Sequence, residues 1–222
     1  SGRLSKILRN RILELTRLPH HLKARATLDG CVIKVASRQT SRISLEQIPL
    51  EESGAEVVAY GAKDNGEMGG GAAGCLLVEA GPALENAARK ELDHRSREIG
   101  EAFLTPAFGK LLERGTLWVC HIISIIKHTP QGSYCPHPER LKDGVYEAMS
   151  LAQKQGLESM AISALATGEG RVAPEHSARL MLGAARRFFR DHPESPLRLV
   201  VCLPSDRDLS AFERELSHPS EG

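Results

Sequence analysis

A glycine-dense segment, Met68–Cys75, is the part of this sequence best suited to bind an anion. Its three adjacent glycines, Gly69–Gly71, can leave their backbone N–H groups pointing into one concavity, and the missing side chains let a phosphate approach closely. A helix that begins just after them would add its positive N-terminal end to the same spot. We therefore predict a phosphate or pyrophosphate site here, and a flexible loop tip is the alternative.

The neighbours of this segment favour the site. Residues 56–59 are typical of a short buried strand, and residues 82–92 carry apolar residues on one helical face. A strand, a glycine loop and a helix in this order place anions at the carboxyl ends of strands in α/β proteins. The segment is neither a dinucleotide fingerprint nor a P-loop, because its glycine spacing differs and no Gly-Lys-Ser/Thr follows it.

A second glycine loop, Ala166–Gly170, follows the apolar run 160–164. Glu169 in this loop would face a bound diphosphate and weaken its binding, unless Lys63 or Arg171 offsets the like charge. An exposed Lys63 would itself contribute little to affinity, because water and salt screen an ammonium. Asp64 and Glu67 precede the first glycine segment, so carboxylates for general-base chemistry are also present.

Four residues around 121–137 have the composition of a zinc site: His121, His128, Cys135 and His137. Their spacing is irregular, and His121 ends an apolar run, where a hydrogen-bonded core histidine is the commoner arrangement. We therefore expect no metal site.

Buried strands that alternate with amphipathic helices predict a three-layer α/β/α domain. The predicted strands are 31–35, 56–59, 102–105, 117–126, 159–164 and 197–203, and the predicted helices are 82–98, 139–155, 174–190 and 206–216. The polar stretch up to Glu52 predicts a further short strand or an irregular connection. An N-terminal basic amphipathic helix over 4–18 completes a division into a helix or linker (1–25), the α/β domain (26–217) and a disordered tail (218–222).

The composition narrows the class of partner. Lys and Arg number 29 against 28 Asp and Glu, so the net charge of +1 provides no global field for nucleic acid or an anionic membrane. No apolar run approaches the roughly 18 residues of a membrane span. Five cysteines without a CxxC pair fit a reducing compartment, so we expect an intracellular protein, cytoplasmic or nuclear. The start at Ser1-Gly2 suggests a processed tag or a domain cut from a longer polypeptide with further domains.

Four segments in uninterrupted order resemble the macrodomain family of ADP-ribose-recognising modules. They are Gly69–Leu84, with its glycine run and helix; Gly100–Ile123, with Thr105-Pro106 and the strand that carries His121; Ala161–Gly168, a strand that enters a Thr-Gly loop; and Leu199–Leu209, the last strand with its Ser-Asp continuation. The resemblance covers residues 30–217 and implies a mixed, roughly six-stranded sheet with ADP-ribose across the strand ends.

The resemblance also implies a ligand-binding set. Residues 69–74 would hold the distal ribose and part of the diphosphate, residues 166–171 would wrap the diphosphate, and the last strand would border the adenine. The candidate residues are Gly69, Gly70, Gly71, Ala72, Ala73, Gly74, Ala166, Thr167, Gly168, Glu169, Gly170, Arg171 and Leu203. No cofactor, metal ligand or catalytic residue is included.

Several family features are missing. Family hydrolases carry Asn-Ala-Ala-Asn where this chain has Tyr60-Gly61-Ala62-Lys63, and the acidic residue associated with activating water falls on Ala73. Gly170 stands in place of an aromatic residue, and the Gly-Asp pair that reads adenine has no counterpart between Val35 and Glu46. We therefore expect a reader of free or protein-attached ADP-ribose, or of a related nucleotide, without hydrolysis. A hydrolase with a relocated base and a scaffold that binds no nucleotide are the alternatives.

Overall fold

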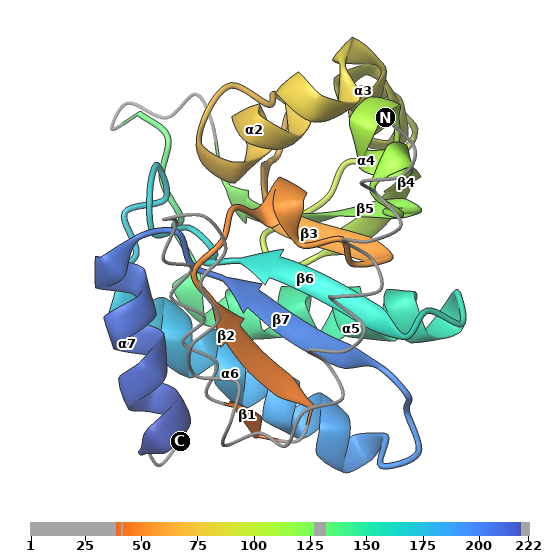
Figure 1. Ribbon diagram of the computed structural model, residues 1–222. Coiled ribbons are helices and arrows are strands. Elements are labelled where there is room, and N and C mark those ends of the chain that lie inside the picture. The colour runs from red at the N-terminus through yellow and green to blue at the C-terminus, as the bar shows by residue number, and fades with distance from the viewer. Residues whose placement is uncertain (1–38, 41, 127–131, 219–222) are drawn as a thin grey trace, which may run out of the picture. The chain divides into compact units, whose positions relative to one another are not determined.

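The computed structural model describes residues 39–40, 42–126 and 132–218, which form a mixed sheet between helices (Figure 1). All of them lie in one compact unit, Ser37–Gly222. The predicted helix over 4–18, the predicted strand over 31–35, residue 128 and the tail beyond 218 lie outside the described residues.

The described strands form one seven-stranded sheet in the order β1-β2-β7-β6-β3-β5-β4. Their bounds are β1 (Gln39–Thr40), β2 (Ile43–Glu46), β3 (Val57–Lys63), β4 (Ala102–Pro106), β5 (Trp118–Ile125), β6 (Ser159–Ser163) and β7 (Arg198–Cys202). The five inner strands run parallel, and the outer strands β1 and β4 pair antiparallel with their neighbours. Because the inner strands are parallel, their carboxyl ends meet at one edge of the sheet.

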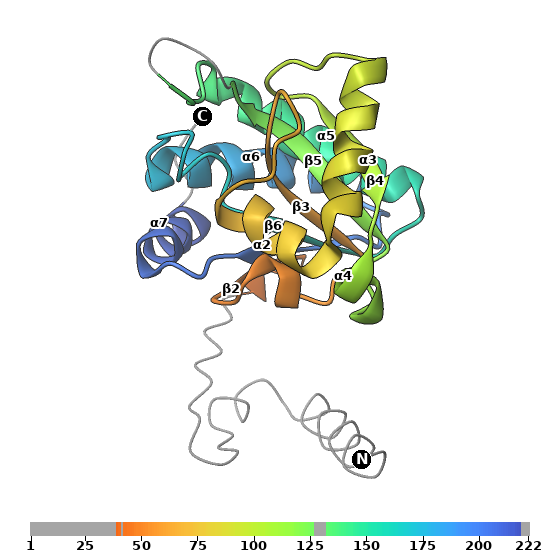
Figure 2. The same cartoon turned by 90° about the horizontal axis from the view of Figure 1, so that it is seen from above.

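Helices cover both faces of this sheet. They are α2 (Gly71–Ala80), α3 (Pro82–His94), α4 (Gly109–Glu113), α5 (Leu141–Lys154), α6 (Pro174–Asp191) and α7 (Asp206–Ser217), with short 3-10 turns at η2 (Leu50–Glu52) and η3 (Pro138–Arg140). Helices α5 and α6 lie side by side on one face, while α2 and α3 lie on the other (Figures 1 and 2). The three-layer α/β/α prediction is therefore confirmed. No described helix is long and apolar enough to cross a membrane.

The strands at the centre of the sheet are continuous apolar runs in the sequence because they are buried on both faces. Val57, Val58 and Ala59 of β3 are fully buried, as are six consecutive residues of β5 from Val119 to Ser124. Strands covered by helices on both faces bury every side chain, so no alternation remains in the sequence.

Helix α2 corrects one prediction. The segment Met68–Cys75 is a loop only as far as Gly70, because α2 begins at Gly71 and includes Ala72, Ala73 and Gly74 in its first turns. Glycine disfavours helix formation, which hides such a start in the sequence. Burial of Leu76 and Ala80 against the sheet and η2 overrides that propensity.

Candidate functional site

The carboxyl ends of three neighbouring parallel strands frame a cavity of about 240 Å³. In the sheet, Lys63 at the end of β3 pairs with Ile125 at the end of β5, and Ser163 ends the adjacent strand β6. The residues that line this cavity, called here the glycine pocket, are Gly61, Lys63, Glu67, Gly69, Gly70, Gly71, Ala72, Ala73, Ile125, Ser163, Ala164, Ala166, Gly168 and Glu169.

The N-terminus of α2 forms one wall of the glycine pocket. Its cap residue, Gly70, provides no side-chain hydrogen bond, and the first turn contains no acidic residue. The first N–H groups of an α-helix have no acceptor within the helix. Gly71, Ala72 and Ala73 all line the pocket, so their backbone N–H groups lie beside it. The positive end of the helix favours an anion there.

The glycines of this wall leave room for a ligand. A Cβ atom built on Gly69, Gly70 or Gly71 would meet nothing within 4 Å, so internal packing does not demand glycine there. Only Gly71, with φ of +54°, adopts a backbone conformation that disfavours other residues. Gly74 lies outside the lining, and its N–H is already bonded to the Gly70 carbonyl.

The loop 164–172 forms the opposite wall and is held by its own backbone. The N–H of Val172 donates to the Ala166 carbonyl and that of Arg171 to the Gly168 carbonyl, both at 3.0 Å. Ala166 and Arg171 both have φ near +60°, which costs roughly 1–2 kcal/mol per non-glycine residue. The surrounding contacts therefore fix this loop in one shape before any ligand arrives.

Gly170 serves this loop by packing. A Cβ atom on Gly170 would lie 2.5 Å from the Ala166 Cβ, so no larger residue fits in this conformation. Its carbonyl accepts a hydrogen bond from the N–H of Cys135, 3.1 Å away. The buried thiol of Cys135 thus belongs to a segment that supports the loop.

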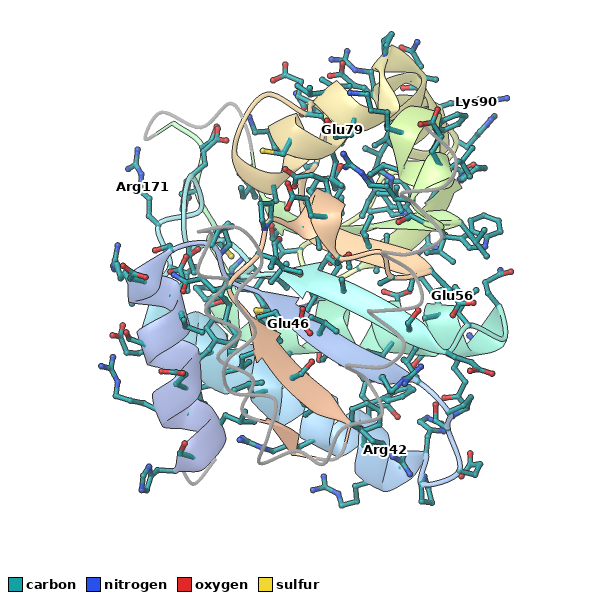
Figure 3. All side chains as sticks on the ribbon, in the orientation of Figure 1. Arg42, Glu46, Glu56, Glu79, Lys90 and Arg171 are labelled. Atoms are coloured by element: carbon teal, nitrogen blue, oxygen red, sulfur yellow. The ribbon has the colours of Figure 1, made fainter. Side chains whose placement is uncertain are left out.

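Four further predicted residues lie outside the pocket lining. Thr167 interacts through its side chain with Asp208 in the first turn of α7. Figure 3 shows Arg171 at the outer edge of the loop, away from the sheet. Leu203 is fully buried in the core, where its N–H donates to the Glu46 carbonyl. None of these three residues lines the pocket, and neither does Gly170.

An ion pair bridges the two walls. The Lys63 Nζ lies 3.0 Å from the Glu169 Oε2, and the Lys63 side chain is only 13% exposed while that of Glu169 is 42% exposed. The expectation of an exposed, screened Lys63 is therefore wrong. Partial burial strengthens the interaction of this ammonium with any charge in the pocket.

His121 is a core residue, as expected, and lies within β5 rather than at its end. It is fully buried, its Nδ1 lies 2.7 Å from the Tyr60 hydroxyl, and its Nε2 lies 2.8 Å from the Thr105 Oγ1. Phe103 stacks on the ring at a centroid distance of 4.6 Å. Burial lowers the pKa of His121 to about 3, so the ring is neutral and both nitrogens are occupied.

Tyr60 takes the place of the first family asparagine but points into the core. Only 2% of it is exposed, and desolvation raises the pKa of its hydroxyl. The next residue, Gly61, lines the pocket, and a Cβ there would lie 2.5 Å from the Oγ of buried Ser124. In the described part of the chain, no three His, Cys, Asp or Glu side chains are arranged to hold a metal ion.

The structure thus brings together eight of the thirteen predicted residues and adds six that the candidate set omits. The added residues are Gly61, Lys63, Glu67, Ile125, Ser163 and Ala164. Most of them end strands or directly follow them. Their position after apolar runs was a usable signal, since parallel strand ends share one edge.

Comparison with known proteins connects this geometry to a family. Residues 60–181 match the model of the Macro domain. A Thermotoga maritima protein is 28% identical over 178 residues, covering 79% of this chain and 28% of its own length. The bovine ADP-ribose glycohydrolase MACROD1 is 24% identical over 200 residues, covering 86% of this chain and 58% of its own length. This chain therefore spans less than two thirds of both relatives.

Two solved structures share the fold. The Oceanobacillus iheyensis macrodomain with ADP has a TM-score of 0.69 at 21% identity and covers 82% of this chain and 94% of its own. The Trypanosoma brucei macrodomain in complex with ADP-ribose has a TM-score of 0.65 at 21% identity, covering 79% and 69%. The matched residues include the second half of β3, both walls of the glycine pocket and the first turns of α6, and the chain belongs to the Macro domain family.

Proposed function

We propose that this chain binds ADP-ribose, or a related nucleoside diphosphate, in the glycine pocket and acts as a reader without hydrolysis. One observation carries the proposal: the uncapped N-terminus of α2 and the preformed loop 164–172 face one cavity at the carboxyl edge of a parallel sheet. Backbone N–H donors from two sides suit a diphosphate, which offers acceptor oxygens in several directions.

The size of the pocket indicates which part of the ligand it takes. At about 240 Å³ it is smaller than the roughly 300–1,000 Å³ of pockets that enclose a whole drug-sized ligand. We therefore assign the diphosphate and the adjoining ribose to the pocket. The names of the bovine relative and of the trypanosome complex support ADP-ribose as this ligand.

The side chains around the pocket favour binding without hydrolysis. Tyr60 is buried in the core, Lys63 is paired with Glu169, and Ala73 carries no group that could activate water. Losing a positioned base typically costs about 10²–10⁴-fold in rate. A hydrolase with a relocated base is the second candidate function, because Glu67 and Glu169 both line the pocket and the bovine relative is named a glycohydrolase.

Two measurements test the proposal. Calorimetric titration with ADP-ribose, alongside ADP and poly(ADP-ribose), should give saturable binding of ADP-ribose, and three silent titrations would instead favour a scaffold that binds no nucleotide. Incubation with a mono-ADP-ribosylated protein should release no ADP-ribose. Multiple turnovers that are lost in Glu67→Gln or Glu169→Gln would replace the reader with a hydrolase.

A further inference from the structure

A second and larger cavity lies between α5 and α6, on the face of the sheet opposite α2. Both views show these two helices side by side (Figures 1 and 2). The cavity measures about 530 Å³ and is called here the α5–α6 groove. Its lining residues are Glu139, Lys142, Tyr146, Arg179, Leu180, Gly183, Ala184, Arg187 and Arg190, and none of them lines the glycine pocket.

The groove is basic although the whole chain is nearly neutral. Four cationic side chains line it, against the carboxylate of Glu139 in the lining and that of Asp191 beside Arg187, while the net charge of the chain is only +1. On α6, Arg179, Arg187 and Arg190 are separated by eight and three residues, so they lie along one face of the helix. This row of arginines is about 17 Å long.

One of these arginines is held in place before any partner binds. The guanidinium of Arg187 lies over the Tyr146 ring at 4.9 Å and also pairs with Asp191 at 3.5 Å. A guanidinium fixed in this way loses less side-chain freedom on binding a carboxylate.

The floor of the groove contains a glycine that internal packing does not explain. Gly183 lies in the middle of the 18-residue helix α6, where alanine would stabilise the helix, and a Cβ atom there would meet nothing within 4 Å. By contrast, Gly144 of α5 is required, because its Cβ would lie 2.5 Å from the Ile122 Cγ2. Gly183 therefore exposes helix backbone in a basic groove, which permits close approach of another chain.

We propose that the α5–α6 groove binds an acidic peptide segment of a partner protein. Carboxylates of the peptide pair with Lys142, Arg187 and Arg190, and its backbone passes over Gly183. An amphipathic segment suits the floor, where Leu180 and Ala184 lie between the charged rims.

Carboxylates at both ends of the groove favour a peptide over a nucleic acid. At one end Glu139 lies 2.8 Å from His176 and 3.7 Å from Arg179, and at the other Asp191 contacts Arg187. A phosphate chain, charged at every unit, would run past both carboxylates. A peptide can place its acidic residues only where the cations are.

Fluorescence anisotropy tests the proposal with a labelled peptide of about 15 residues that carries Glu at every third position, with Leu and Ala between. We expect saturable binding at low salt that weakens as salt is added. Lys142→Glu/Arg190→Glu should weaken it at least tenfold. The matched control Lys90→Glu/Lys154→Glu makes the same charge change on exposed residues outside the groove and should leave it unchanged; Figure 3 shows Lys90 projecting from α3.

A second variant separates binding from folding. Gly183→Leu fills the floor with a good helix former, so the thermal midpoint should not fall while peptide binding is lost. ADP-ribose binding should be the same in all these variants, so the two sites are tested independently. Failure of the wild type to bind the peptide, equal binding of a peptide with Lys in place of Glu, equal loss in the control, or tighter binding of an oligothymidylate of the same length would overturn the proposal.

Discussion

The ion pair across the glycine pocket makes opposite predictions for its two members. Lys63 and Glu169 are 3.0 Å apart and both line the cavity, so in the wild type their charges largely cancel for an incoming diphosphate. Removing one partner exposes the ligand to the other. We therefore expect Lys63→Met to weaken ADP-ribose binding and Glu169→Gln to strengthen it.

The size of the effect follows from Coulomb's law. A unit charge about 6 Å from a diphosphate of charge about −2 contributes roughly 1.4 kcal/mol at the dielectric constant of water, which is about tenfold in affinity. The dielectric constant of water gives the smallest expected effect, because the Glu169 side chain is 42% exposed while that of Lys63 is only 13% exposed. Each single variant should therefore shift Kd by at least about tenfold, and the double variant Lys63→Met/Glu169→Gln should return to within about threefold of wild type.

Calorimetry at two salt concentrations provides the assay. Both shifts should shrink at higher salt, since screening acts on the half-exposed carboxylate. Lys90→Met, an exposed lysine on α3, is the matched control and should bind like wild type. Wild-type affinity in Lys63→Met, or weaker binding in Glu169→Gln, would refute the electrostatic reasoning.

Three further predictions concern packing and titration. Gly168→Val places a side chain in the pocket at a position where a Cβ atom meets nothing, so the variant should still fold. The loss of two charged hydrogen bonds should weaken ADP-ribose binding about 150-fold or more. Gly183→Val is the remote control, and wild-type affinity in Gly168→Val would contradict the site. Burial lowers the pKa of His121 from 6.5 to about 3. The contribution of this residue to the free energy of unfolding is therefore complete above pH 6.5 and falls as the pH drops toward 3, by about 2 kcal/mol at pH 5. Urea unfolding at a series of pH values should show this slope, and the slope should be absent in His121→Phe. Gly61→Ala should lower the stability measured by thermal unfolding by about 1–3 kcal/mol, because its Cβ would lie 2.5 Å from the Ser124 Oγ. Adding Ser124→Ala removes this contact and should restore the stability. A double variant that stays destabilised would show that the backbone, and not this contact, is responsible.

Most of the sheet was predictable because it is deeply buried. The predicted strands 117–126 and 159–164 agree with β5 and β6 to within a residue or two, since a strand covered on both faces is apolar throughout. Strand β3 extends four residues past its predicted end at Ala59, because Gly61 and Lys63 do not belong to an apolar run. The short helix α4 was not predicted, since its five residues carry too little periodicity.

The candidate site was predictable in its backbone but not in its side chains. Glycine runs after apolar strands identify both walls, because this chemistry is local in sequence. Lys63 and Glu169 are more than a hundred positions apart in the sequence. Only the pairing of β3 with β6 brings them into contact, so their ion pair and the burial of Lys63 could not be predicted from the sequence. Leu203, expected beside the adenine, directly follows β7 and is fully buried, a position that its apolar run in the sequence does not distinguish from the rest of the core.

The most direct test of the central claim is a crystal structure of the protein soaked with ADP-ribose. The diphosphate oxygens should lie within about 3.2 Å of backbone N–H groups from both walls, Gly71–Ala73 of α2 and Gly168 of the opposite loop. A diphosphate bound elsewhere on the protein, or one that touches neither wall, would contradict the account.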